Sequence, residues 1–263
     1  MSLFNNLSNY LHIVSSFYIS SLVSFKYSEK ITIDQHTRIR ILSKPKNANK
    51  NIFIIQGGVY HKNKNSMQLR LTSLFIKKNI RIFTYEKDLP VVNFLYSHDI
   101  HKCLKYIKSK FNGKLIVIGY SMGGILLLNY LSYGYDDADL YIPTCCPLDF
   151  ERFEYTINNN FIFKYILNQN LKAFNVNNME ELFNLAGINL QSYKEFYSNF
   201  ADRLKKSRKI WKNKTIYIVG SEDPLTITYK NYKNVFPKTY VVIKGWHCCI
   251  DCIFYAVELS QSL

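Results

Sequence analysis

Leu115-Ile-Val-Ile-Gly-Tyr-Ser-Met-Gly-Gly124 is the stretch around which this 263-residue chain is organised. Its first four residues are apolar and predict a buried strand, and the apolar run 125–131 that follows predicts a helix. A serine between a strand and a helix lies on a very tight turn with a strained backbone, which lifts its hydroxyl clear of the chain. Side chains at Gly119 and Gly123 would crowd that turn. Ser121 is therefore a candidate nucleophile; the alternative is a glycine-rich turn with an incidental serine.

A serine hydroxyl is a weak nucleophile unless a base takes its proton, and the base needs a carboxylate to orient it. In a parallel α/β sheet the active residues collect at the carboxyl ends of the strands. Asp223 follows the predicted strand 215–219, and His247 follows the predicted strand 239–243. The chain order Ser121, Asp223, His247 is the order expected of one particular fold.

Predicted strands and helices alternate along most of the chain, which indicates a mainly parallel, doubly wound α/β sheet covered on both faces. The sheet is predicted from residues 30–149 and 211–263. Residues 150–210 are rich in Phe, Tyr, Asn and Lys, with helical pieces and no strong strand, and predict a helical cap inserted in the sheet domain. Among the strands, residues 139–142 are expected to end at Pro143.

With these features the sequence resembles the α/β-hydrolase superfamily, from about Ile31 to the C-terminus. The resemblance is carried by four segments: Gly119-Tyr-Ser-Met-Gly-Gly124, Gly57-Gly58, Asp223-Pro224 and Gly245-Trp-His247. The turn Gly119–Gly124 around Ser121, which we call the elbow, is similar to the lipase, esterase and thioesterase branches. So is the Gly-x-x-Asp-Pro segment at 220–224. The segment Pro147-Leu-Asp149 resembles branches that act on medium-chain esters and phospholipids.

The resemblance implies an oxyanion hole made of two backbone amides. One is the amide of Met122, because the first turn of a helix has N–H groups and a partial positive charge that suit an oxyanion. The other is the amide of Gly58 by the simplest alignment, with Val59 one residue away. The family often has His-Gly after its third strand where this chain has Gln56-Gly57, but the contact there is made by the backbone.

His247 as the base and Asp223 as the acid both have competitors in the sequence. His61 and His98 compete for the base, although neither follows a strand late in the chain. Glu222 and Asp149 compete for the acid, since some family members use an acid after the sixth strand. An aspartate before Pro224 is also a common turn or helix-cap residue.

Residues 1–29 form a separate N-terminal region. Residues 1–25 contain no Lys, Arg, Asp or Glu and predict an amphipathic helix. The helix lacks the features of a secretory signal and is too polar for a confident transmembrane span. Two interpretations stay open: peripheral contact with a membrane surface, or packing on its own domain.

The formal net charge is +15, with Lys and Arg at 34 positions and Asp and Glu at 19. The lysines are scattered and no nucleic-acid recognition motif is present, so a solvated basic surface is favoured over specific nucleic-acid binding. The six cysteines occur as two adjacent pairs and two single residues, which is not a secreted disulfide framework. An intracellular, cytoplasmic protein is expected, with membrane association depending on residues 1–25. No metal site is expected from His247-Cys248-Cys249 with Cys252, because adjacent cysteines cannot easily ligate one ion.

The sequence therefore predicts a serine hydrolase that cleaves carboxylic esters, lipid-like or other acyl esters, through an acyl-enzyme on Ser121, without metal or organic cofactor. His247 is the expected base and Asp223 its orienting acid. The rivals are an amide or thioester hydrolase or an acyltransferase on the same residues, and a catalytically silent fold used for binding. The cap aromatics have two interpretations, an acyl-chain pocket or the cap's own core.

Overall fold

The computed structural model describes residues 18, 29–43, 45–57, 67–77, 79–87, 97–148, 150–185, 190–226, 236, 238–242 and 244–262. Its strands are β1 (Glu29–Thr32), β2 (Thr37–Ser43), β3 (Lys50–Ile55), β4 (Ile80–Lys87), β5 (Lys114–Tyr120), β6 (Leu140–Thr144), β7 (Tyr217–Gly220) and β8 (Thr239–Val242). Its helices are α2 (Met67–Phe75), α3 (Ser97–Lys110), α4 (Met122–Ser132), α5 (Phe150–Asn159), α6 (Phe161–Phe174), α7 (Met179–Leu185), α8 (Leu190–Trp211) and α10 (Ile250–Ser262).

The strands form one sheet in the order β1-β2-β4-β3-β5-β6-β7-β8. The pairs β1–β2 and β2–β4 are antiparallel, and every later pair is parallel. β5 lies near the middle, with Ile118 level with Ile54 of β3 on one side and Ile142 of β6 on the other. Parallel strands buried on both faces are rich in β-branched residues, as these are. The predicted mainly parallel α/β sheet is confirmed.

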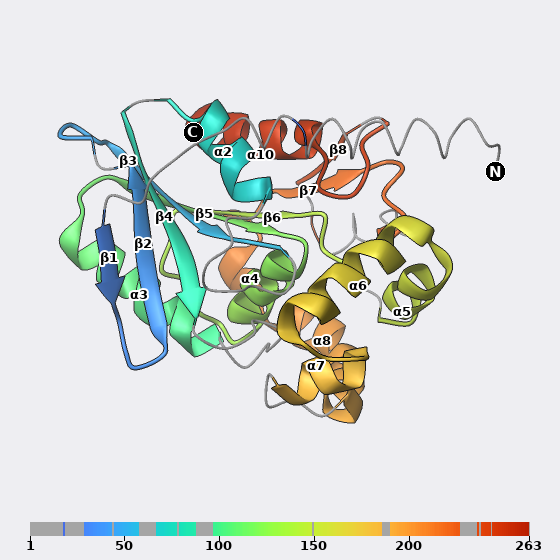
Figure 1. Ribbon diagram of the computed structural model, residues 1–263. Helices are drawn as coiled ribbons and strands as arrows, with labels where there is room; N and C mark the ends of the chain where they lie inside the picture. Colours follow the sequence, from blue (N-terminus) through green and yellow to red (C-terminus); the bar gives the residue numbers. More distant parts are fainter. Residues whose placement is uncertain are drawn as a thin grey trace.

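Helices cover both faces of the sheet (Figure 1). α2 and α10 lie on one face, where their apolar side chains share a buried cluster with Ile52 and Ile54 of β3 and with Ile116 and Ile118 of β5. α3, α4 and α8 lie on the other face, where Leu127, Leu204 and Trp211 belong to a second buried cluster. The two-layer cover is the doubly wound arrangement expected from the alternation of elements.

The helical segment 150–211, which contains α5 to α8, falls between β6 and β7. In Figure 1, α5, α6 and α7 lie beside the sheet at one end of the molecule, whereas α8 runs back under it. Phe200 and Leu204 of α8 are buried in the cluster that contains α4. The division into a core and a cap stays a prediction.

β6 continues one residue past the predicted end at Pro143 and finishes at Thr144. Proline has no N–H to donate, so one hydrogen bond toward β7 is missing at Pro143. The residues two positions before and after it still make theirs. Tyr141 N donates to Lys214 O at 2.7 Å, and Cys145 N donates to Ile218 O at 2.8 Å. Pro143 therefore interrupts the ladder toward β7 without ending the strand.

The predicted N-terminal helix 1–25 lies outside the described residues, except for Tyr18. No helix in the described ranges is long and apolar enough to cross a membrane.

Candidate active site

Ser121 lies on the turn between β5 and α4, with φ of 51° and ψ of −118°. A positive φ is unfavourable for an L-residue other than glycine, so the surrounding structure must hold this conformation. The Ser121 amide donates to Thr144 O at 2.8 Å, which ties the turn to β6. The side chain makes no capping hydrogen bond with α4. The turn thus has the strained geometry that the sequence predicts.

The glycines around Ser121 are required by close backbone contacts. A Cβ on Gly119 would lie 2.8 Å from Gly123 O, and one on Gly123 would lie 2.2 Å from Gln56 O. A Cβ on Gly57 would lie 2.9 Å from the Cβ of Ser121. Real Cβ atoms do not approach so closely, so any larger residue would force β5, α4 and the end of β3 apart.

Ser121, His247 and Asp223 form one hydrogen-bonded line. Ser121 Oγ lies 2.8 Å from His247 Nε2, and His247 Nδ1 lies 2.8 Å from Asp223 Oδ2. Because a carboxylate only accepts, Nδ1 carries the proton and donates to Asp223, which leaves Nε2 to accept from the serine hydroxyl. The structure therefore brings together the three residues that the sequence singles out.

The competing residues lie elsewhere or outside the described chain. His98 Nδ1 lies 3.3 Å from the Tyr135 hydroxyl. The Glu222 amide donates to Gly245 O, but it is the neighbouring Asp223 whose carboxylate meets His247. His61 and Asp149 are outside the described residues.

The loops that carry Asp223 and His247 are joined to each other. Glu222 N donates to Gly245 O, and Lys244 N donates to Ser221 Oγ, both at 2.9 Å. A Cβ on Gly220 would lie 2.2 Å from Gly245 O, so the two backbones touch. This contact fixes the distance between the carboxylate and the imidazole.

Asp223 is fully buried, and burial raises its carboxyl pKa, while the hydrogen bonds from His247 and from the Leu225 amide, the latter at 2.9 Å, favour the ionised form. Burial disfavours the charged form of His247 too and so lowers its pKa, but the charge of Asp223 and its hydrogen bond outweigh burial and raise the imidazole pKa. A base of raised pKa bonded to a serine hydroxyl can accept that hydroxyl's proton.

Of the two amides expected to bind an oxyanion, one lies in the described part of the chain and one does not. Met122 is the first residue of α4 and directly follows Ser121, as expected. Gly58 lies outside the described residues. The role of both amides stays a prediction.

All six cysteines are buried and none forms a disulfide. Cys249 Sγ lies 3.7 Å from Cys252 Sγ, and Cys248 has a φ of 46°. No group of three or more His, Cys, Asp and Glu side chains in the described part of the chain has the geometry to hold a metal ion.

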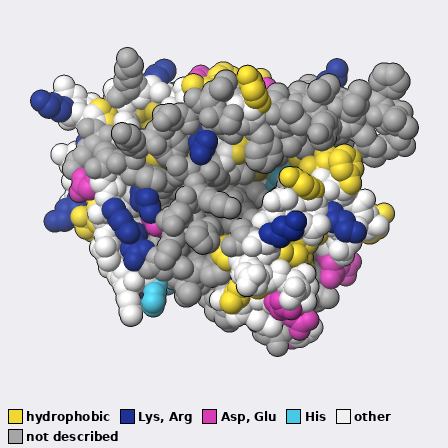
Figure 2. Space-filling model, in the orientation of Figure 1, with side chains coloured by type: hydrophobic (Ala, Val, Ile, Leu, Met, Phe, Trp, Pro, Cys, Tyr) yellow, Lys and Arg dark blue, Asp and Glu magenta, His cyan; other side chains and the backbone are white. Residues whose placement is uncertain are grey.

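The aromatic residues of the helical segment are divided among three environments. Phe183 and Phe200 are buried in the cluster shared with α4. Tyr155, Phe161 and Tyr165 are 62 to 67% exposed, and Figure 2 shows hydrophobic side chains gathered on this side of the molecule. Phe163 contacts His247, with ring centroids 5.5 Å apart. The sequence pattern did not separate these environments.

These observations define the class: the chain has the α/β-hydrolase fold. Among solved structures, an esterase from Pyrobaculum calidifontis is similar at a TM-score of 0.64 and 13% identity, covering 100% of this chain and 93% of that one. The esterase Pf2001 of Pyrococcus furiosus is similar at 0.57 and 15%, covering 91% and 92%. A bromoperoxidase from Bacillus anthracis is similar at 0.53 and 15%, covering 89% and 99%. No protein-family model and no curated protein sequence matches this chain significantly.

Proposed function

We propose that this protein is a serine hydrolase that cleaves carboxylic esters. The observation that supports the proposal is the unbroken line of two 2.8 Å contacts from Ser121 through His247 to the buried Asp223. The esterases among the similar structures agree with it, although at 10 to 15% identity they support the fold alone.

In the proposed reaction the Ser121 oxygen attacks the ester carbonyl carbon while its proton passes to His247 Nε2. The Met122 and Gly58 amides donate to the resulting oxyanion. The tetrahedral intermediate then collapses, and His247 returns the proton to the departing alkoxide, which leaves an acyl group on Ser121. Water, deprotonated by His247, releases the acid in the same way. Asp223 stabilises the imidazolium in both steps.

The substrate that we favour has an apolar acyl chain. The helical segment beside the site is rich in aromatic residues, and Phe153 and Leu167 are partly buried against both apolar clusters of the core. Apolar surface next to a nucleophile favours an apolar substituent on the ester carbonyl. Amides, thioesters and acyl transfer remain alternatives on the same three residues.

Covalent labelling with a fluorophosphonate tests the proposal. We expect the wild type to be labelled and Ser121→Ala to lose labelling and ester hydrolysis by on the order of 10⁴-fold or more, because the three residues act as a unit. Ser132→Ala, at the other end of α4, is the matched control and should react like the wild type. A folded wild-type protein that resists the reagent would identify a catalytically silent fold.

A further inference from the structure

Phe163 of α6 is packed against the loop that carries His247. Its ring stacks on Trp246 at 5.0 Å between centroids and 23° between planes, and it meets the His247 ring edgewise at 5.5 Å and 67°. Phe163 and Trp246 are both buried. One side chain of the helical segment therefore contacts both the imidazole and its neighbour in sequence.

The His247 loop has a strained backbone. His247 lies in a turn between β8 and α10, flanked by Lys244 with φ of 57° and Cys248 with φ of 46°. Left-handed conformations at non-glycine residues persist only where packing over-determines them. The stacking of Phe163 on Trp246 is one contact that packs this loop in place.

α5 and α6 are consecutive helices that form a hairpin, and α5 contacts the loop that carries Asp223. Arg152 Nε and Thr156 Oγ1 of α5 donate to the carbonyl of Pro224, at 3.0 and 3.3 Å, and Pro224 directly follows Asp223. Asn160 joins α5 to α6 and caps α6 by accepting from the Phe163 amide at 3.4 Å. The hairpin α5–α6 thus contacts both loops of the site.

We propose that Phe163 is a positioning residue, which holds the His247 imidazole on the line between Ser121 and Asp223 from the α5–α6 hairpin. The inference rests on the proposed serine hydrolase function. Without the ring, a void opens beside the imidazole, and the strained loop can relax into it. The imidazole then spends less time at hydrogen-bonding distance from both partners, and misplacement of a reacting group lowers the rate of the chemical step rather than substrate binding.

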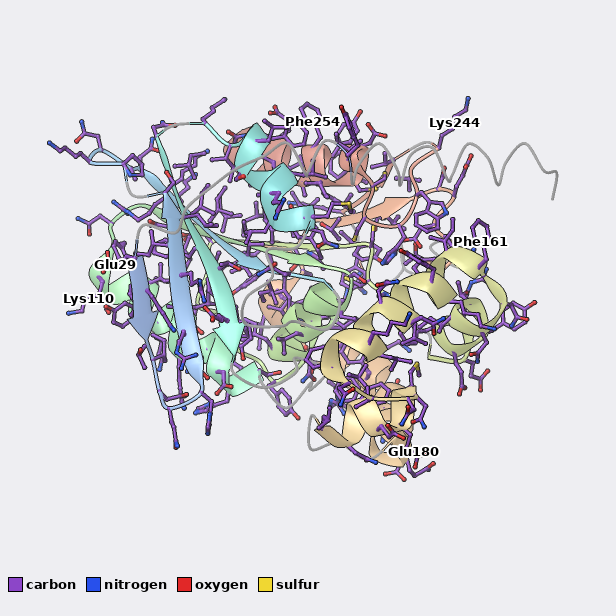
Figure 3. The ribbon with its side chains drawn as sticks, in the orientation of Figure 1. Glu29, Lys110, Phe161, Glu180, Lys244 and Phe254 are labelled. Carbon is purple, nitrogen blue, oxygen red and sulfur yellow. The ribbon has the colours of Figure 1, made fainter. Side chains whose placement is uncertain are left out.

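The test compares two phenylalanines on one helix. Phe161 is 62% exposed and points away from the molecule at the end of α6, as Figure 3 shows, whereas Phe163 is buried against the site. We expect Phe163→Ala to lower kcat by on the order of tenfold with little change in KM. Phe163→Leu, which keeps much of the volume but no ring, should be intermediate, and Phe163→Tyr should restore activity. Phe161→Ala should match the wild type.

A spectroscopic readout separates positioning from turnover. The proton between His247 Nδ1 and Asp223 Oδ2 is expected as a downfield NMR resonance that is sharp in the wild type and in Phe161→Ala, and broadened by exchange in Phe163→Ala and Phe163→Leu. If the wild type resists fluorophosphonates, the proposed function fails while this resonance still tests the positioning. Phe163→Leu carries the test if the alanine variant does not fold. A wild-type resonance in both Phe163 variants, or an effect confined to KM, overturns the proposal.

Discussion

The elbow around Ser121 and the helical segment 150–211 both contact the site, but they do so with different parts of the chain. At the elbow the close contacts are between backbones, with Gly119 against Gly123 and Gly123 against Gln56. The helical segment instead contacts the site largely through side chains, those of Thr156 and Phe163 among them. Backbone contacts this close permit only glycine, whereas a packed side chain leaves no fixed signature in the sequence.

This contrast implies a difference in what mutation does to each region. A change at the elbow, or in the hydrogen-bonded side chains of Ser121, His247 and Asp223, should remove the reaction or the fold. A change in the helical segment should adjust the rate or the substrate preference. The predictions that follow test that division, beginning with the largest expected effect.

Asp223→Asn should lower kcat/KM by on the order of 10³- to 10⁴-fold. The amide can donate to His247 Nδ1, which would favour the wrong tautomer and leave Nε2 protonated toward Ser121. Glu222→Gln, one residue away, is the matched control and should cost less than tenfold. Ester hydrolysis by purified variants of equal folded content measures both. Should Asp149→Asn prove the more damaging change, the acid follows β6 and the assignment of Asp223 is wrong.

Gly123→Ala should lower the free energy of unfolding by about 3 kcal/mol or more, because its Cβ would lie 2.2 and 2.3 Å from the carbonyl oxygens of Gln56 and Ile55. Gly134→Ala is the control outside the elbow. Gly134 has φ of 83° but meets nothing nearer than Ile210 Cδ1 at 3.4 Å, so the cost there should be about 1–2 kcal/mol. Urea unfolding of both variants gives the comparison, and equal costs would contradict the close packing of the elbow.

The parts of the site that the sequence could predict are those fixed by the backbone. Strand periodicity and the glycines at 119 and 123 placed Ser121 on its turn, and the positions after two late strands placed Asp223 and His247. The structure gives the contact that favours Asp223 over Glu222. What the sequence pattern left open is where side chains point. Nothing in the pattern distinguishes Phe163 from Phe161, two residues away on the same helix.

The sequence also missed features that depend on distant contacts. The left-handed backbone at Cys145, Lys244 and Cys248 has no glycine to signal it. The packing of α8 on the α4 side of the sheet follows from the return of the chain to β7, which local periodicity does not encode. Both features are decided by tertiary packing, and tertiary packing overrides local preference.

The pH dependence of kcat/KM should show the effect of Asp223 on His247. The base works in its neutral form, so activity rises with pH as the imidazole loses its proton. Since Asp223 raises the His247 pKa against the effect of burial, the midpoint of this limb should lie above the ordinary value of 6.5. In the residual activity of Asp223→Asn, burial is no longer offset, and the midpoint should move to lower pH. His98→Gln should leave it unchanged, and a midpoint unaffected by Asp223→Asn would contradict the pairing.

The smallest expected effect is the gain in binding from each added methylene of the acyl chain. Measuring it tests whether the helical segment adjusts substrate specificity. Burying one methylene contributes about 0.8 kcal/mol, which is roughly a fourfold gain in binding. If side chains of α5 and α6 line the acyl site, kcat/KM for p-nitrophenyl esters should rise from acetate through the longer acyl chains and stop rising where the apolar surface ends. Leu167→Ala, on the core-facing side of α6, should change the length at which the rise stops, while Phe161→Ala, at the exposed end, should not. Rates that are flat or fall from acetate onward would show that the aromatic residues pack only on one another and on the core, and the substrate would then be an ester of a small, polar acid.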